Sequence, residues 1–288
     1  MNIVSIEIYV RRLVNKMGFL RVWDGIELFY KKDICIEPKG VILINHGFAE
    51  HLGRFDYVAN AFCKAGYNVY RYDLRAHGQT KAELGFIESF NDFIKDTHEM
   101  VEMIINENND LPIFMLGHSM GGLITALYGI KYKDKLKGQI FSGAALGTLS
   151  SAKGIRKPII QIGSILFKNT LIKNPIDDAI CSDRDVFEAY LNDPLVLKKA
   201  SINFYYEFLI NSLKRFESKL NEYSYPCFIT HGEIDKIVPK ELSLSFYDRI
   251  SSSDKEIRIY KGLYHEILNE KEKDQILNDM IQWLDNRV

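Results

Sequence analysis

The chain has 288 residues, enough to bury a large hydrophobic core. Hydrophobic residues make up 47% and charged residues 26% of the sequence, and the formal net charge is −1 at pH 7. Because a nucleic-acid-binding domain needs a basic surface, this balance argues against nucleic acid as a partner.

The N-terminal segment predicts a short amphipathic helix over residues 3–17, where apolar side chains fall at helical spacing. The same segment, MNIVSIEIYVRR, has no basic residue before its apolar stretch and no small-residue cleavage site, so it does not match a signal peptide. The following DGIELFYKK is typical of one arm of a hairpin.

From residue 41 onward, apolar strands alternate with longer helices. We expect strands at 41–45, 68–73, 112–116, 138–143, 226–232 and 256–260. Helical patterns fall near 55–65, 90–107, 120–132, 239–250 and 272–286. This alternation predicts an α/β fold with a mostly parallel sheet and helices on both faces.

The alternation breaks between about residues 147 and 220, which read as helical and irregular with no clear strand. Open parallel sheets bind ligands at the carboxyl ends of their strands. We therefore expect a core of residues 1–146 and 221–288 and a helical cap, residues 147–220, over the site. The apolar run IIQIGSILF within it fits a core helix of the cap or a membrane-facing surface equally well.

The motif GHSMGG follows the strand PIFML and opens an amphipathic helix. A strand that turns into a helix within so few residues strains its corner residue and needs small neighbours. Gly117 and Gly121 flank Ser119 at two-residue spacing, which is the pattern of a nucleophile elbow. The sequence therefore predicts that Ser119 is a catalytic nucleophile.

A serine hydroxyl needs a base, and the base needs an acid that orients it. Of the seven histidines we favour His265, in a loop after the last predicted strand, over His118, which lies in the turn itself. The acid is expected in ITHGEIDKIVP, where Asp235 lies farther past the strand end than Glu233. The order serine, aspartate, histidine is that of α/β-hydrolases.

The oxyanion of such a reaction needs two backbone N–H donors. Met120, directly after the serine, supplies one, and the loop INHGFAEH supplies the other at Phe48. A metal site formed by His46, Glu50 and His51 is disfavoured, because the intervening glycine turn does not match the helical H-E-x-x-H geometry.

HGFAEHLGRF, YDLRAHGQT, GHSMGG, NDPLV, HGEIDKIV and YHEILNE together resemble the monoacylglycerol lipase and lysophospholipase family of serine hydrolases, over about residues 20–286. The resemblance implies an α/β-hydrolase fold, a Ser119–Asp235–His265 triad, no cofactor, and a mobile apolar cap that meets lipid aggregates. It also implies oxyanion donors at Phe48 and Met120.

The same resemblance implies that Glu50, Arg54 and Tyr190 surround the glycerol end of the substrate. An exposed ion pair between Glu50 and Arg54, four residues apart, is the alternative, and the sequence does not separate the two. The chain departs from the family at Ala76, where glycine is usual, and the cap resembles the family only loosely.

We therefore expect an enzyme that hydrolyses monoacylglycerols or other single-chain lipid esters. A broader carboxylesterase or a lysophospholipase would use the same residues, and an acyltransferase would need a second alcohol as acceptor. A non-catalytic ligand-binding protein is the rival from another class. Four scattered cysteines without a C-x-x-C pair and the absence of an ~18-residue apolar run favour a cytoplasmic protein, with transient membrane contact through the cap.

Overall fold

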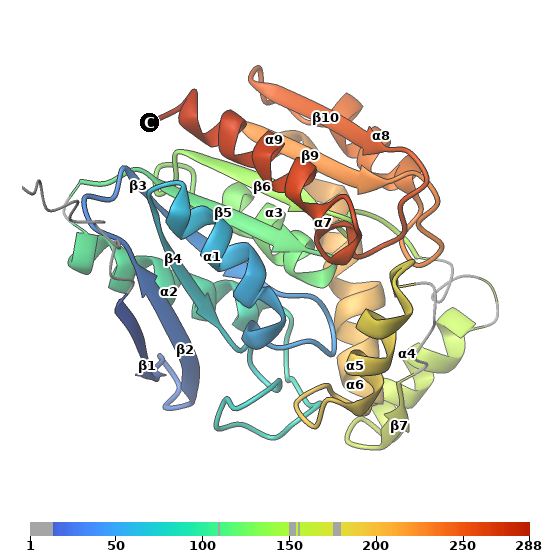
Figure 1. Ribbon diagram of the computed structural model, residues 1–288. Coiled ribbons are helices and arrows are strands. Elements are labelled where there is room, and N and C mark those ends of the chain that lie inside the picture. The colour runs from blue at the N-terminus through green and yellow to red at the C-terminus, as the bar shows by residue number, and fades with distance from the viewer. Residues whose placement is uncertain (1–13, 109, 150–153, 155, 175–179) are drawn as a thin grey trace, which may run out of the picture.

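The computed structural model describes residues 14–108, 110–149, 154, 156–174 and 180–288. Its centre is an eight-stranded sheet in the order β1-β2-β4-β3-β5-β6-β9-β10 (Figure 1). The strands are β1 (Val14–Arg21), β2 (Glu27–Ile34), β3 (Gly40–Asn45), β4 (Tyr67–Tyr72), β5 (Ile113–His118), β6 (Gly138–Ser142), β9 (Cys227–Gly232) and β10 (Lys255–Tyr260). From β4 to β10 every neighbouring pair is parallel, whereas the β1–β2 and β2–β4 pairs are antiparallel.

Helices cover both faces of the sheet, as the sequence predicted. They are α1 (Asp56–Lys64), α2 (Asn91–Asn108), α3 (Met120–Lys131), α8 (Lys240–Arg249) and α9 (Lys273–Asp285). Successive side chains of β3 enter opposite layers: Val41 and Leu43 pack with α2 and α3, whereas Ile42 and Ile44 pack with α1 and α9. All six residues of this central strand are buried, which explains its continuous apolar sequence.

The predicted N-terminal helix is wrong where it can be compared. Residues 14–17 belong to β1, which pairs with β2 along its whole length, and the rest of the predicted helix lies outside the described residues. The expected hairpin arm is confirmed as β2. Pairing of β1 with a neighbouring strand therefore overrides the helical spacing, which ends at Met17.

The segment between β6 and β9 is mostly helical, and Figure 1 shows its helices α4 to α6 gathered beyond one end of the sheet. Its elements are α4 (Arg156–Leu166), β7 (Leu171–Lys173), α5 (Arg184–Asn192), β8 (Lys199–Ser201), α6 (Ile202–Tyr206), the π-helix η4 (Glu207–Ser212) and α7 (Leu213–Lys219). The expectation of no strand here is wrong, because β7 and β8 form a small antiparallel sheet. Three residues per strand are too few to leave an alternating pattern in the sequence.

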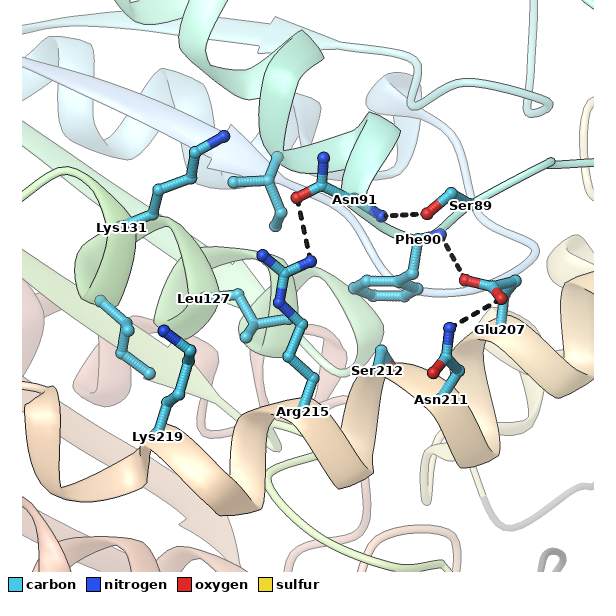
Figure 2. Close-up of a pocket in the computed structure, with 12 residues that line it drawn as sticks. Ser89, Phe90, Asn91, Leu127, Lys131, Glu207, Asn211, Ser212, Arg215 and Lys219 are labelled. Carbon is cyan, nitrogen blue, oxygen red and sulfur yellow. Dashed lines mark hydrogen bonds between the residues drawn. The ribbon is translucent and has the colours of Figure 1, made fainter.

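Two parts of this segment differ in how they pack. The end near β9 joins the main core, where Phe204, Leu213 and Phe216 are buried with sheet residues. Glu207 accepts a hydrogen bond from the Phe90 amide, and Arg215 donates to Asn91 across a groove of about 140 Å³ (Figure 2). The division into a core and a cap stays a prediction.

In α4, by contrast, most of the large apolar residues face outward, and Ile160 alone among those described there packs on the core. Ile165 is 80% exposed, and Ile159, Ile162 and Leu166 are exposed as well, as is Phe167 directly after the helix. Gly163 is the one buried residue among those described in α4. Of the two interpretations of IIQIGSILF, the structure favours an exposed apolar surface over a core helix.

Candidate active site

Ser119 lies at the corner between β5 and α3, as the motif predicted. Its φ of 52° and ψ of −118° are values that residues with a side chain rarely adopt. The strained corner is held in place by its own backbone: the Ser119 amide donates to the Ser142 carbonyl, and the Ser119 carbonyl accepts from the Ala145 amide, both at 3.0 Å. The serine side chain is thereby turned out of the strand at the carboxyl edge of the sheet.

The two flanking glycines are required for close approach. A methyl group on Gly117 would overlap the Thr125 hydroxyl and the Gly121 carbonyl. One on Gly121 would overlap the carbonyl groups of Asn45 and His46 at the end of β3. Helix α3 therefore packs on the strand ends at a distance that only glycine allows.

His265 and Asp235 come together from the loops after β10 and β9. The His265 Nδ1 lies 2.7 Å from Asp235 Oδ2, and both side chains are buried. Glu233 does not take part, because its carboxylate accepts from the Gly262 amide in an exposed loop. The structure thus brings His265 to Asp235 and not to Glu233.

The buried pair has shifted proton affinities. Burial raises the pKa of Asp235, but the charge of His265 and the hydrogen bonds from His231 and His265 outweigh it and hold that pKa well below its usual range. Burial lowers the pKa of His265, and the Asp235 carboxylate more than offsets this, so the net shift is upward. An ionised carboxylate therefore faces Nδ1, which leaves Nε2 as the atom available for proton transfer.

Ser119 and His265 line one pocket of about 920 Å³, which we call the serine pocket. Its lining also includes Phe48, Glu50 and Tyr190, three of the residues named from the sequence. Apolar side chains from the segment between β6 and β9 complete the wall: Ile160, Ile172, Phe187, Tyr205, Phe208 and Leu209. The groove shown in Figure 2 has no lining residue in common with this pocket.

The two expected oxyanion donors come from two loops at the carboxyl edge of the sheet, after β5 and after β3. Met120 is the first residue of α3, so its backbone N–H has no acceptor within the helix. Phe48 lies in the loop after β3 and lines the serine pocket, with its ring against Phe204 and Tyr205. A helix N-terminus also carries partial positive charge, which suits an anionic oxygen.

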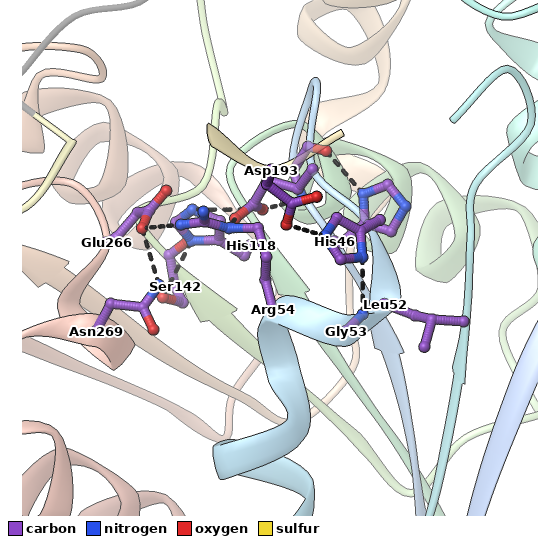
Figure 3. Close-up of polar contacts among 12 residues, drawn as sticks. His46, Leu52, Gly53, Arg54, His118, Ser142, Asp193, Glu266 and Asn269 are labelled. Atoms are coloured by element: carbon purple, nitrogen blue, oxygen red, sulfur yellow. Dashed lines mark hydrogen bonds and ion pairs between the residues drawn. The ribbon is translucent and has the colours of Figure 1, made fainter. Parts of the chain in front are cut away.

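Glu50 and Arg54 form an ion pair, but it is not the exposed pair of the alternative reading. Arg54 Nε lies 2.9 Å from Glu50 Oε1, and its Nη2 lies 2.5 Å from Glu266 Oε2. All three side chains are less than 10% exposed, and the Tyr190 ring lies 4.6 Å from the guanidinium carbon. We call these three residues the Glu50–Arg54–Glu266 cluster; Figure 3 labels Arg54 and Glu266 among the polar contacts of this region.

The Glu50–Arg54–Glu266 cluster lies beside His118. Glu50 Oε2 also accepts from the Gly47 amide at 2.7 Å and lies 4.0 Å from His118 Nε2. Burial raises the pKa of Glu50, but the charges of His118 and Arg54 reverse the shift and bring it to about 2. Burial also raises the pKa of Glu266, with Arg54 opposing the shift.

The residues of the disfavoured metal site have separate partners. The His46 ring bonds to the Gly47 carbonyl and the Leu74 amide, and His51 pairs with Asp193 at 2.7 Å. A different trio, Glu50, His118 and Glu266, has ligand-type atoms within 4.8 Å of one another. Arg54 donates to both of these carboxylates, so a guanidinium supplies positive charge there.

Two residues of this site, His118 and Glu266, were not predicted from the sequence. His118 was set aside as the base because it lies in the turn itself, yet its ring centre lies 4.8 Å from that of His265 and it lines the pocket. Burial lowers the pKa of His118 to about 4. Glu266 was not considered, although its place directly after His265 was the available signal.

The conformation of the turn at Ala76 shows why glycine is usual at this position in the family. Ala76 has a φ of 65° and is fully buried. This left-handed conformation is the one that glycine adopts most readily, so glycine is the expected residue in relatives. The chain forms the turn with alanine nonetheless.

A strained serine at a strand–helix corner, with a His–Asp pair at the ends of later strands, is the arrangement of an α/β-hydrolase. The family described as "Hydrolase_4: Serine aminopeptidase, S33" matches residues 36–272, and the chain belongs to this family. Its relatives include proteins named as lipases and esterases.

The chain is 31% identical to a monoacylglycerol lipase of Mycolicibacterium smegmatis, over 86% of this chain and 89% of that protein. It is 30% identical to phospholipase YtpA of Bacillus subtilis, over 83% and 92%. A soluble variant of the Saccharomyces cerevisiae monoglyceride lipase, solved in complex with a substrate analog, is 25% identical over 97% of both chains, with a TM-score of 0.87. No helix among the described residues is long and apolar enough to cross a membrane.

Proposed function

We propose that the protein is a serine hydrolase that splits monoacylglycerols into glycerol and a fatty acid. The observation that carries the proposal is the serine pocket itself, in which Ser119 and His265 face a large space with apolar walls. Its volume of about 920 Å³ suits one long acyl chain with a small head group. The names of the relatives point the same way.

In this reaction Ser119 Oγ attacks the ester carbonyl carbon while His265 Nε2 takes the hydroxyl proton. The N–H groups of Phe48 and Met120 stabilise the oxyanion that forms. When the carbon–oxygen bond to the alcohol breaks, His265 gives its proton to the departing glycerol oxygen. Water then loses a proton to His265, attacks the acyl ester and releases the acid, while Asp235 orients His265 throughout.

The Glu50–Arg54–Glu266 cluster supports a neutral, hydroxyl-rich leaving group. It joins two carboxyl groups to one guanidinium, so Arg54 has no positive charge to spare for a phosphate. Its oxygen and nitrogen atoms can instead exchange hydrogen bonds with alcohol groups. A glycerol head group fits this chemistry better than a phosphorylated one.

A lysophospholipid is the second candidate, because Arg156, Lys173 and Lys236 also line the serine pocket. Cations at those positions would favour a phosphate head group. The relative named phospholipase YtpA points the same way.

The deciding experiment compares two substrates that share one acyl chain, 1-oleoylglycerol and 1-oleoylglycerol 3-phosphate, in mixed micelles. We expect the neutral ester to be hydrolysed with a kcat/KM at least about tenfold higher. The reverse order would support the lysophospholipid candidate, and faster cleavage of p-nitrophenyl acetate than of either lipid would support a broad carboxylesterase. If Ser119 is not labelled by a fluorophosphonate probe, the protein is not a serine hydrolase.

A further inference from the structure

A second histidine contacts the carboxylate of the His265–Asp235 pair. His231 lies at the end of β9, and its side chain is fully buried. Its Nε2 is 3.1 Å from Asp235 Oδ2 and 2.8 Å from the Val238 carbonyl oxygen. Its Nδ1 is 2.7 Å from the Ser243 hydroxyl on α8. Every polar atom of this ring therefore has a partner.

The partners determine which nitrogen carries hydrogen. The Val238 carbonyl and the ionised Asp235 carboxylate can only accept, so His231 Nε2 must be a donor. The Ser243 hydroxyl can donate to Nδ1 or accept from it, and both cases leave the proton on Nε2. The surroundings of His231 thus keep an N–H directed toward Asp235.

The Asp235 carboxylate accepts from four donors. Its Oδ1 accepts from the amides of Ile237 and Val238 at 2.9 and 2.8 Å. Its Oδ2 is shared between the two imidazoles, His265 at 2.7 Å and His231 at 3.1 Å. The single oxygen that orients His265 is therefore also the one that His231 contacts.

We propose that His231 is a positioning residue of the triad, one that fixes Asp235 Oδ2 opposite His265 and limits the basicity of that oxygen. The inference rests on the proposed function, since it assigns Asp235 the orienting role. A carboxylate oxygen that receives a second donor holds the neighbouring imidazolium less strongly. Removal of the His231 donor should then make His265 easier to protonate.

A purely structural role for His231 predicts something different. His231 also binds the Val238 carbonyl, so its loss could loosen the loop that carries Asp235 and lower kcat at all pH values alike. The pH profile separates the two roles. The other titratable groups around His265 are His118, Glu50 and Glu266, and they are the same in every variant proposed below.

The experiment measures kcat/KM for a soluble p-nitrophenyl ester from pH 5 to 9 in His231→Phe and His231→Gln. Phenylalanine keeps the ring but donates nothing, whereas the glutamine amide nitrogen is as many bonds from the backbone as His231 Nε2. We expect His231→Phe to lose about tenfold in kcat/KM. The acid limb of its pH profile, where kcat/KM falls as His265 becomes protonated, should move upward by about half a pH unit. His231→Gln should restore both most of the activity and the position of the acid limb.

Ser243→Ala is the matched control, because it removes a hydrogen bond of His231 but leaves the donor to Asp235 in place. It should leave the acid limb unmoved. If the phenylalanine variant does not fold, His231→Asn takes its place, since its shorter side chain cannot reach Asp235. An unmoved acid limb in the variants without a donor, or no rescue by glutamine, overturns the proposal. Absence of any ester hydrolysis in the unmodified protein would instead overturn the proposed function.

Discussion

We call the loops that follow the sheet strands the floor of the serine pocket, and the segment between β6 and β9 its roof. The floor is buried and densely hydrogen-bonded, whereas helix α4 of the roof presents apolar side chains outward. On the floor, Asp235 and His265 are 8% and 5% exposed, and Asp235 alone has four donors. On the roof, Ile165 and Leu166 of α4 are 80% and 65% exposed. In the proposed function, the atoms that need fixed positions would lie on rigid elements, and the surface proposed to meet lipid is the accessible one.

The comparison predicts that changes in the floor affect every substrate and that changes in the roof affect only long-chain substrates. The largest effect is expected for Ser119→Ala, which should lower kcat by about 10⁴-fold or more on every ester. Adding His265→Ala should cost little more, because the residues of a triad act as a unit. Steady-state kinetics on a micellar and a soluble ester, with the melting temperature as a check on folding, measure this. Retention of a tenth of the activity by Ser119→Ala would rule out the mechanism.

Asp235→Asn should have the next largest effect, a loss of about 10³- to 10⁴-fold in kcat, because the amide favours the wrong histidine tautomer. Glu233→Gln is the matched control in the same loop and should stay within a few-fold of the unmodified enzyme, since Glu233 contacts only an exposed loop amide. Equal losses in the two variants would mean that the loop, not the carboxylate at position 235, carries the effect.

The floor also predicts a pH dependence. The proposed mechanism requires neutral His265; burial lowers its pKa, but the Asp235 carboxylate more than offsets this and raises it above the ordinary 6.5. As the pH falls through that raised pKa the base becomes protonated, so kcat/KM should decline with a midpoint above pH 6.5. A stopped-flow or plate assay of a soluble ester across pH 5 to 9 gives the midpoint. A midpoint below that ordinary value would contradict an ionised Asp235 beside His265.

Most of the floor could be predicted from the sequence because its signals are local. Gly117 and Gly121 mark the turn around Ser119, and Asp235 and His265 each follow a recognisable strand. The Glu266 contact with Arg54 joins residues 212 positions apart, and no local pattern records such a pairing. The position of the His118 ring beside His265 is likewise a contact between distant parts of the chain, which the sequence spacing does not show.

The roof was harder to predict. Its strands β7 and β8 have three residues each, and the residues 175–179 between them lie outside those described. The apolar spacing of α4 is the same whether its face is buried or exposed, so the sequence left both readings open. At the other end of the chain, the helical spacing up to Met17 was overridden by pairing with β2, a contact that depends on the folded sheet.

A smaller effect is expected where the floor meets the head group. Glu266→Gln removes one carboxyl group from the Glu50–Arg54–Glu266 cluster and leaves Arg54 paired with Glu50 alone, so the cluster repels a phosphate less. We expect the preference for 1-oleoylglycerol over its phosphate to narrow by about tenfold. Glu272→Gln, an exposed neighbour in the same stretch, is the control and should leave the ratio unchanged. An unchanged ratio in Glu266→Gln would separate the cluster from head-group selection.

The smallest and most selective effect is expected on the roof. Ile165→Asp puts a charge on the most exposed apolar residue of α4, where nothing in the described core depends on it. If α4 meets the lipid surface, the loss of apolar contact and the added charge should weaken binding to liposomes and slow hydrolysis of long-chain monoacylglycerol about fivefold. Cleavage of a soluble acetate ester should be spared, because the floor is untouched.

Ile105→Asp on α2 is the control for this change, since it also places a charge on an exposed isoleucine, but away from the serine pocket. It should alter neither liposome binding nor either activity. Equal losses of Ile165→Asp on the long-chain and the acetate ester would show that α4 supports the fold of the site and does not meet lipid. Full activity on both esters would show that the exposed face of α4 takes no part in substrate capture. The apolar side chains that line the serine pocket, such as Ile160, Phe187 and Phe208, would then account for a preference for long acyl chains without lipid contact by α4.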